Sequence, residues 1–172
     1  KKKTKIVYNE IYKIDLNNFE YDLNYKKISS NDFVKIEDNI NNYFELYEFL
    51  LDLETKKFLG KKIKFLDNQQ NKYFFDEVIV NTDNDKLYGK KIKFLDNQQN
   101  KYFLNEVMIN TNNDNLYGKD LNIEFNKSLF GNSNNDPRLK AKSVKIKDRS
   151  SFLKKGVFTS CSKDNDCPPW SI

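Results

Sequence analysis

The sequence contains no histidine, and only two of its 172 residues are cysteine. The absence of histidine excludes Ser–His and Cys–His nucleophilic dyads and removes the commonest proton shuttle and metal ligand. Two cysteines are too few for a four-ligand structural zinc site. The five glycines are isolated from one another, so no glycine-rich loop could cradle a phosphate. We therefore expect a protein that is not an enzyme and that holds no metal or cofactor.

Arginine and long apolar runs are also scarce. Arg138 and Arg149 are the only arginines among 30 basic residues, which face 25 acidic residues for a net charge of +5. Base readout and bidentate phosphate binding favour arginine, so we expect no nucleic-acid partner. The lysines are typical of a solvated sheet face with charged strand edges, the alternative being loose attraction to anionic lipid or nucleic acid. No apolar run is long enough for a membrane-spanning helix.

Apolar residues make up 38% of the chain, whereas aromatic residues reach 15%. This composition argues against a compact ball and favours a thin, elongated sheet, in which most residues have one face in water. Asparagines cluster between regular apolar segments, where turns are expected. We expect residues 1–172 to form one domain. Because the chain starts with three lysines and ends within a strand-like segment, we also expect it to be an excerpt of a longer protein.

An internal repeat organises the chain. The segment Gly60–Phe74 recurs without change as Gly89–Phe103, an offset of 29 residues, and Leu116–Lys119 begins a third copy. The period is lost over residues 126–136 and resumes with Leu139–Ile146. A fixed period of this length predicts stacked supersecondary units. We expect about five rungs, each of two strands and two turns, with imperfect outer rungs.

Strands are predicted by alternating polar and apolar residues, as in Lys61–Leu66 and Lys142–Lys147. The alternation breaks at Asp76–Glu77 and at Asn105–Glu106, which indicates a bulge or corner. Polar connectors are predicted at residues 67–71, 81–85 and 96–100. Residues 43–53 have apolar side chains at helical spacing, but their alignment with residues 73–82 favours a strand.

The C-terminal segments carry a family resemblance. Phe152–Cys161, which ends in Phe-Thr-Ser-Cys, and Cys167–Ile172, which begins Cys-Pro-Pro-Trp, resemble the end of the N-terminal periplasmic domain of the LptD family of lipopolysaccharide-assembly proteins. The rungs, such as Asn105–Ile109 leading to Leu116–Ile123, look like the repeats of the OstA-like superfamily, which includes LptA and LptC. The resemblance implies an all-β open jellyroll, in which two sheets fold like a taco around an apolar interior.

The same resemblance implies a function and partners. Lipopolysaccharide acyl chains would slide through the interior, at the periplasmic face of the outer membrane, toward a C-terminal outer-membrane barrel. The implied partners are lipopolysaccharide, an LptA-like bridge at the N-terminal edge (residues 6–16), the chain's own barrel and its LptE lipoprotein plug. A family disulfide to the barrel would use Cys161, whereas Cys167 has no matching position. From the residues alone, free thiols, a local clip and pairing beyond this chain all stay open.

The predicted lining consists of apolar residues that recur at equivalent repeat positions. The alternative for each is ordinary core packing, and the rival function is a closed β-solenoid that acts as a structural or adhesive module without binding lipid. The predicted lipid-groove residues are Val34, Ile36, Phe49, Leu51, Ile63, Phe65, Val78, Val80, Ile92, Phe94, Val107, Ile109, Leu121, Ile123, Val144 and Ile146.

Overall fold

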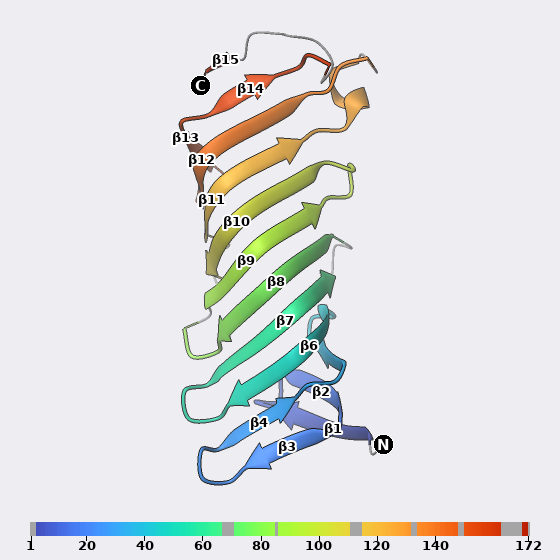
Figure 1. The fold of residues 1–172 in the computed structure, drawn as a ribbon, viewed down its shortest axis with the longest axis vertical. Helices are drawn as coiled ribbons and strands as arrows, with labels where there is room; N and C mark the ends of the chain where they lie inside the picture. Colours follow the sequence, from blue (N-terminus) through green and yellow to red (C-terminus); the bar gives the residue numbers. More distant parts are fainter. Residues whose placement is uncertain are drawn as a thin grey trace.

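The computed structural model describes residues 3–66, 71–84, 86–110, 115–131, 134–147, 150–162 and 170–171. These residues form an antiparallel sheet whose strands stack along the long axis of the molecule (Figure 1). The strands are β1 (Lys3–Tyr8), β2 (Tyr12–Asn17), β3 (Phe19–Asp22), β4 (Lys27–Ser30), β5 (Val34–Glu37), β6 (Tyr43–Asp52), β7 (Lys57–Leu66), β8 (Lys72–Asn81), β9 (Lys86–Leu95), β10 (Lys101–Asn110), β11 (Asn115–Glu124), β12 (Arg138–Lys147), β13 (Ser150–Lys154), β14 (Val157–Thr159) and β15 (Trp170–Ser171).

The topology is that of successive hairpins. From β6 to β12 each strand pairs with its neighbours in sequence, and the main path runs β1-β2-β5-β6-β7-β8-β9-β10-β11-β12-β14-β15. At the two ends of the stack one long strand faces two short ones: β6 pairs with both β5 and β4, and β12 pairs with both β13 and β14. The sheet does not close on itself, so the open all-β architecture that the resemblance implied is confirmed.

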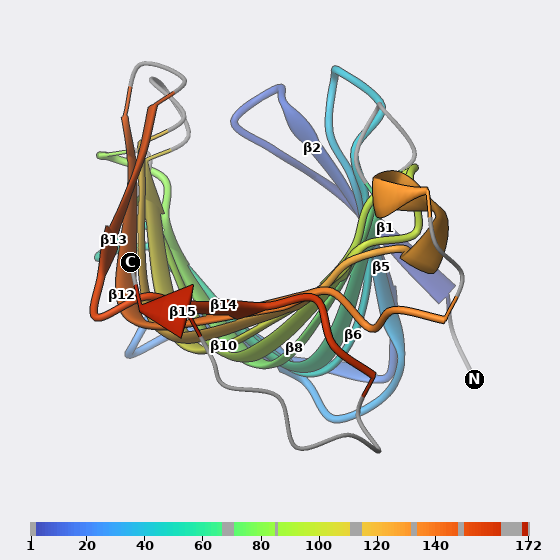
Figure 2. The same cartoon turned by 90° about the horizontal axis from the view of Figure 1, so that it is seen from above.

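Each long strand bends near its middle, and the sheet is U-shaped when viewed down its long axis (Figure 2). Between β8 and β9 the pairing steps from Phe74 opposite Lys93 to Glu77 opposite Lys90, which leaves the bend between them. Lys91 has a φ of 47°, and Lys62 and Asp120 at equivalent repeat positions have φ of 51° and 52°. Such bulges bend a strand and strengthen its twist. The predicted corner at Asp76–Glu77 and Asn105–Glu106 is thus confirmed.

The resemblance implied two folded sheets, whereas the described strands form one continuous sheet. The two walls of the U are the two halves of the same ten-residue strands, joined through the bend. A strand of this length crosses both walls because the bulge redirects the backbone without ending the ladder on either side.

Strand β6 settles the ambiguous segment in favour of the repeat, and the helical alternative is wrong. Phe44 and Leu46 alternate along the first half of β6, and Phe49 and Leu51 alternate along the second half. The corner between the halves adds a three-residue step to a two-residue period. The helical spacing in the sequence mixes the two faces of the strand, because Leu46 is buried whereas Tyr47 is 45% exposed.

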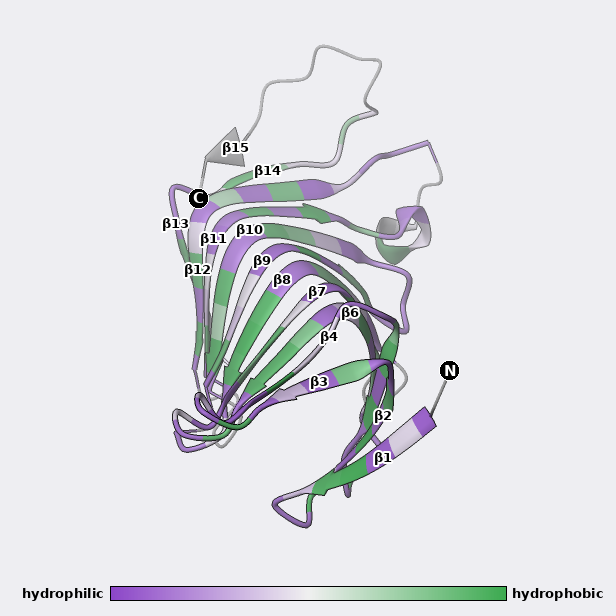
Figure 3. Cartoon of the chain, turned by 60° about the horizontal axis from the view of Figure 1, so that its bottom comes forward, coloured by the Kyte–Doolittle hydropathy of each residue, from purple (hydrophilic) through white to green (hydrophobic). Residues whose placement is uncertain are grey.

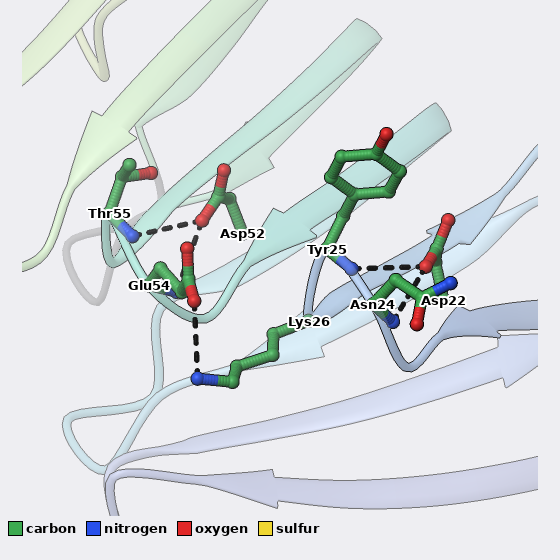
Figure 4. Close-up of polar contacts among 7 residues, drawn as sticks. All are labelled: Asp22, Asn24, Tyr25, Lys26, Asp52, Glu54 and Thr55. Atoms are coloured by element: carbon green, nitrogen blue, oxygen red, sulfur yellow. Dashed lines mark hydrogen bonds and ion pairs between the residues drawn. The ribbon is translucent and has the colours of Figure 1, made fainter.

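Asx-type turns follow β3 and β6, and the two turns lie side by side at one end of the U (Figure 4). The Asp52 Oδ1 atom accepts hydrogen bonds from the backbone N–H groups of Glu54 and Thr55 at 3.1 and 2.9 Å. Asp22 makes the equivalent pair of bonds in the turn after β3. The two turns are linked by an ion pair of 3.1 Å between Lys26 Nζ and Glu54 Oε1. Aspartate at the start of each turn thus fixes hairpin length and register.

The opposite turns follow another repeated pattern. Asp96 Oδ1 accepts from the backbone N–H groups of Gln98 and Asn100, and the Asn100 side chain donates to Asp96 Oδ2 at 2.9 Å. Asp38 and Asn42 make the same arrangement. The connector predicted at residues 96–100 is confirmed. In the other two predicted connectors, residues 67–70 and residue 85 lie outside the described residues.

The interruption of the repeat at residues 126–136 is a short excursion between β11 and β12. It contains the 3₁₀ helix η1 (Lys127–Phe130), and residues 132–133 within it lie outside the described residues. The Asn126 backbone N–H donates to Asn100 Oδ1 at 2.9 Å, which ties the excursion to the repeated turn. After it, the buried residues of β12 have the same spacing as those of β9, as the alignment predicts. β12 nevertheless runs antiparallel to β11.

Candidate functional site

The buried side chains project onto one face of the sheet, and this face is the concave face of the U. At the bend, a Cβ atom placed on Gly89 would lie 2.7 Å from Phe75 Cδ1, although the two residues belong to different walls. Side chains of two walls can converge in this way only inside the bend. Figure 3 shows hydrophobic segments recurring from strand to strand along the sheet. The concave face is therefore a continuous apolar surface.

Fifteen of the sixteen predicted lining residues lie in the two apolar clusters of the concave face. The sixteenth, Phe94, stacks between Tyr73 and Tyr102 on the same face. Val34, Ile36, Phe49 and Leu51 are the most deeply buried, with at most 2% exposure. Seven others, at repeat positions next to the bend or in the C-terminal part of the stack, are buried as well: Ile63, Val78, Ile92, Val107, Leu121, Ile123 and Val144. The remaining five are half-buried and lie farther from the bend: Phe65, Val80, Phe94, Ile109 and Ile146.

The sequence reasoning missed the first half of each long strand. In β8, for example, Tyr73 and Phe75 point to the same face as Val78 and Val80. The signal was available: inward residues recur at i, i+2, i+5 and i+7, where the three-residue step is the corner. Residues missed in this way are Phe44, Leu46, Phe58, Tyr73, Phe75, Leu87, Tyr102, Leu104, Leu116 and Leu139.

Five aromatic rings form a ladder along one wall, which we call the aromatic row: Phe44, Phe65, Tyr73, Phe94 and Tyr102. Consecutive ring centroids lie 4.4, 5.1, 4.5 and 4.9 Å apart, with interplanar angles of 28° or less. These residues are direct cross-strand partners from β6 to β10. Because each ring face inside the row is covered by the next ring, the row offers ring edges to whatever lies in the concave face.

Aliphatic residues extend the aromatic row in both directions. Ile6, Ile14 and Ile36 precede Phe44 as successive cross-strand partners. At the other end Ile123, Leu139 and Phe158 follow Tyr102 in the same manner. On the other wall a facing row runs from β6 to β12 and consists of Leu51, Phe58, Val80, Leu87, Ile109, Leu116 and Ile146. Tyrosine hydroxyls are the only polar side-chain atoms in these two rows of described residues.

One of those hydroxyls is anchored. Tyr102 Oη donates to Asp96 Oδ2 at 3.0 Å, so the ring is fixed by the repeated turn. Burial first, and then the hydrogen bond to the Asp96 carboxylate, raise the pKa of Tyr102 to about 12. Burial would raise the pKa of Asp96, but hydrogen bonds from Asn100, Tyr102 and Gln98 outweigh it and lower that pKa.

A second repeated feature follows the outside of the bend. Lys61–Glu48, Lys90–Glu77 and Lys119–Glu106 form ion pairs of 2.5, 2.6 and 2.6 Å, one in each repeat. The hydrogen bond to its glutamate is the main cause that raises the pKa of each lysine, and the bond to Lys90 lowers the pKa of Glu77. These side chains are exposed, so each pair adds little stability. They do place balanced charge on the convex side of the corner.

The N-terminal end of the stack has two edge strands rather than the predicted one. Within residues 6–16, only Ile6–Tyr8 belongs to the edge strand β1, because β2 is paired on both sides. The other edge strand is β3, which pairs only with β4. Phe19 and Tyr21 on β3 are 39% and 47% exposed. The edge predicted at residues 6–16 is therefore confirmed for Ile6–Tyr8 and wrong for the part in β2. The reason is that the first rung is split between short strands.

The structure constrains one of the two cysteines. Cys161 is disulfide-bonded, which contradicts the free-thiol alternative for this residue, and Cys167 lies outside the described residues. The Arg138 guanidinium donates to the Cys161 carbonyl oxygen at 3.0 Å, which holds the segment after β14 against the start of β12.

The described part of the chain contains no cluster of three or more histidine, cysteine or acidic residues that could hold a metal ion. Among the same residues, no helix has the length and apolarity needed to cross a membrane. The chain matches no model of a known protein family, and no curated protein is similar to it in sequence. The fold and the apolar concave face are therefore the basis of the functional argument.

Proposed function

We propose that this chain shields lipid acyl chains in transit, and that its cargo is lipopolysaccharide on the way to an outer-membrane barrel. The observation that carries the proposal is the uninterrupted apolar row that crosses the sheet from Ile6 on β1 to Phe158 on β14. A surface that is apolar along its whole length suits a ligand that must move along it.

The energetic reason is the cost of exposing hydrocarbon to water. Each methylene group costs roughly 0.8 kcal/mol, so an acyl chain of about a dozen carbons costs on the order of 10 kcal/mol. Equivalent rungs remove that cost evenly, because each repeat presents the same residue types at the same positions. A single deep pocket would instead hold the lipid in place.

Exposure distinguishes the residues that pack the core from those that can meet a ligand. Residues beside the bend, such as Ile63, Val78 and Ile92, are 4% exposed and form the packed floor of the concave face. Phe65 and Phe94 on the aromatic row, together with the later residues of the facing row such as Ile109, are half-buried and lie nearer the opening. The acyl chains would lie along these half-buried rows.

The geometry of the aromatic row favours hydrocarbon over sugars or bases. Bases and sugar rings bind aromatic side chains by stacking on a free ring face. In this row the faces stack on one another, from Phe44 to Tyr102. Ring edges and aliphatic side chains remain, and these contact methylene groups well.

The resemblance of the Cys161 and Cys167 segments to the LptD family supports lipopolysaccharide as the cargo and the periplasmic face of the outer membrane as the location. It also supports an LptA-like bridge at the N-terminal edge, and the chain's own barrel with its LptE plug at the other end. The rival structural or adhesive module was expected to be a closed solenoid, whereas this sheet is open.

Site-specific photo-crosslinking tests the proposal. A photoreactive amino acid replaces Phe94, which points into the concave face, or its neighbour Lys93, which is exposed on the other face. We expect crosslinks to purified lipopolysaccharide at position 94 and none at position 93. If the folded protein crosslinks at neither position, the lipid-shielding function is wrong and an adhesive or structural role becomes the better account.

A further inference from the structure

A second elongated apolar surface lies on the convex face. A groove of about 750 Å³ crosses the strands from β8 to β13. One side is a ladder of direct cross-strand partners that contains Ile79, Tyr88, Met108, Tyr117 and Phe152. Ile79, Tyr88, Tyr117 and Phe152 are exposed. Exposed apolar residues contiguous over this many strands are typical of a binding surface.

Strand alternation also defines the second side of the groove, opposite the apolar ladder, and the floor between the two sides. The other side is the row of ion pairs that includes Lys90–Glu77 and Lys119–Glu106. Because these charges are paired with one another, their aliphatic stems can line the groove while the charged ends stay in water. Gly89 and Gly118 lie between the two sides, so the floor is largely backbone.

The dimensions of the groove select an extended chain. Its two sides stand two residues apart along each strand, about 6.6 Å, and diverge outward because the strands bend beneath the charged side. A helix is 10–12 Å wide with its side chains and does not enter such a slot. Five strand-to-strand steps give a length of about 24 Å. A single extended hydrocarbon chain matches both dimensions.

The charges of the groove differ between its two ends. Toward β8 the lysines are paired with glutamates. At the β12–β13 end lie Lys145 and Lys154, and neither forms an ion pair with any residue in the described ranges. Lys145 Nζ lies 5.4 Å from the centroid of the Tyr117 ring, and Ser143 is the cross-strand partner of Lys154. This end is complementary to an anionic group, and the Ser143 hydroxyl adds a hydrogen-bond donor.

We propose that the convex groove binds a long-chain fatty acid as its anion. The carboxylate lies between Lys145 and Lys154, and the hydrocarbon chain extends past Tyr117, Met108 and Tyr88 toward Ile79. This site is separate from the concave face, because side chains on alternate residues project to opposite faces of the sheet. It therefore does not depend on the lipid-shielding function proposed above.

Titration of the full chain with a fluorescent fatty acid, displaced by palmitate, tests this site. We expect saturable binding that Met108→Glu weakens at least tenfold, because it places a carboxylate in the path of the chain. The double variant Lys145→Glu/Lys154→Glu should also weaken binding at least tenfold. Phe74→Glu is the matched control, since Phe74 is 41% exposed but does not line the groove. It should bind like the unmodified chain.

Three results would overturn the assignment. The first is a folded protein that shows no saturable palmitate binding, and the second is palmitate binding that Met108→Glu leaves unchanged. The third is binding to anionic phospholipid vesicles without binding to monomeric palmitate, which would make the convex face a membrane-contact surface. Crosslinking of lipopolysaccharide at position 94 in the Met108→Glu variant keeps the two proposals distinguishable, because that reaction reports on the concave face alone.

Discussion

Phe75 fills the space that a side chain on Gly89 would need. A Cβ atom on Gly89 would lie 2.7 Å from Phe75 Cδ1 and 3.1 Å from Phe75 Cε1, distances at which one of the two must move. The same relationship recurs one repeat earlier between Leu46 and Gly60, and one repeat later between Leu104 and Gly118. Glycine is thus required at this repeat position because a large side chain from the other wall packs onto it.

Gly89→Ala should therefore destabilise the protein by about 1–3 kcal/mol, the usual cost of overpacking a filled core. Chemical denaturation checks this, with Lys93→Ala on the exposed face as a control that should change little. Combining Gly89→Ala with Phe75→Leu should cost less than the sum of the two single substitutions, because the smaller side chain makes room. Strict additivity would contradict the proposed contact.

The repeat predicts that one rung can be removed cleanly. Deleting residues 60–88 joins Leu59 to Gly89 and restores a strand with the sequence of β7, Lys-Phe-Leu-Gly-Lys-Lys-Ile-Lys-Phe-Leu. We expect a folded, shorter protein with an unchanged proportion of strand in circular dichroism and a cooperative thermal transition. The structural reason is that every cross-strand partner is replaced by its equivalent in the next repeat. The same holds for every contact between a glycine and a large side chain of the other wall.

A deletion one residue shorter, of residues 60–87, is the matched control. It moves the inward residues on one side of the junction to the outward face, because side chains alternate with a period of two. This variant should aggregate or lose its cooperative transition. If both deletions fold equally well, the strand register derived from the repeat is wrong.

Tyr102 predicts a dependence of stability on pH in the alkaline range. Its pKa is raised from about 10 to about 12 by burial and by the bond to Asp96, so the folded state holds the phenolic proton more tightly than the unfolded state does. The stability that this contributes is present in full below pH 10, the pKa of the unfolded state, and is lost as pH rises toward 12. Urea unfolding at pH 9, 10 and 11 should show a steeper loss for the unmodified chain than for Tyr102→Phe. Equal slopes would argue against the Tyr102–Asp96 bond.

The free edge strand at the N-terminal end of the stack predicts where a bridge protein would join. Strand β3 is paired on one side only and presents Phe19 and Tyr21. Replacing both by lysine should leave the fold intact, since each is already exposed, and should abolish binding of a purified LptA protein by charging the free edge. Tyr47→Lys, at 45% exposure on β6, is the control. If the Phe19/Tyr21 variant binds LptA as well as the unmodified chain does, the bridge must join at another surface.

Much of the candidate site could be predicted from the repeat, because equivalent positions in a stack face the same way. Ile92 and Phe94 were found through their counterparts Ile63 and Phe65, and all four lie on the concave face. Tyr73 and Phe75 were missed because the corner interrupts the two-residue period that carried the prediction. The convex groove was missed because its row alternates aromatic, aliphatic and basic side chains, as in Tyr117 and Lys145, and so has no uniform signal in the sequence.

The sequence by itself determined the rung, its period of 29 residues, its turns and the face to which residues in the second half of each long strand point. These features follow from local alternation and from the aspartates that begin the turns. Only the tertiary structure decided that both walls belong to one continuous sheet, that Phe75 packs onto Gly89, and which apolar residues remain half-buried. Burial depends on how sharply the strands bend and on what the opposite wall places across the bend. Those distances arise between residues far apart in the chain, and no local pattern specifies them.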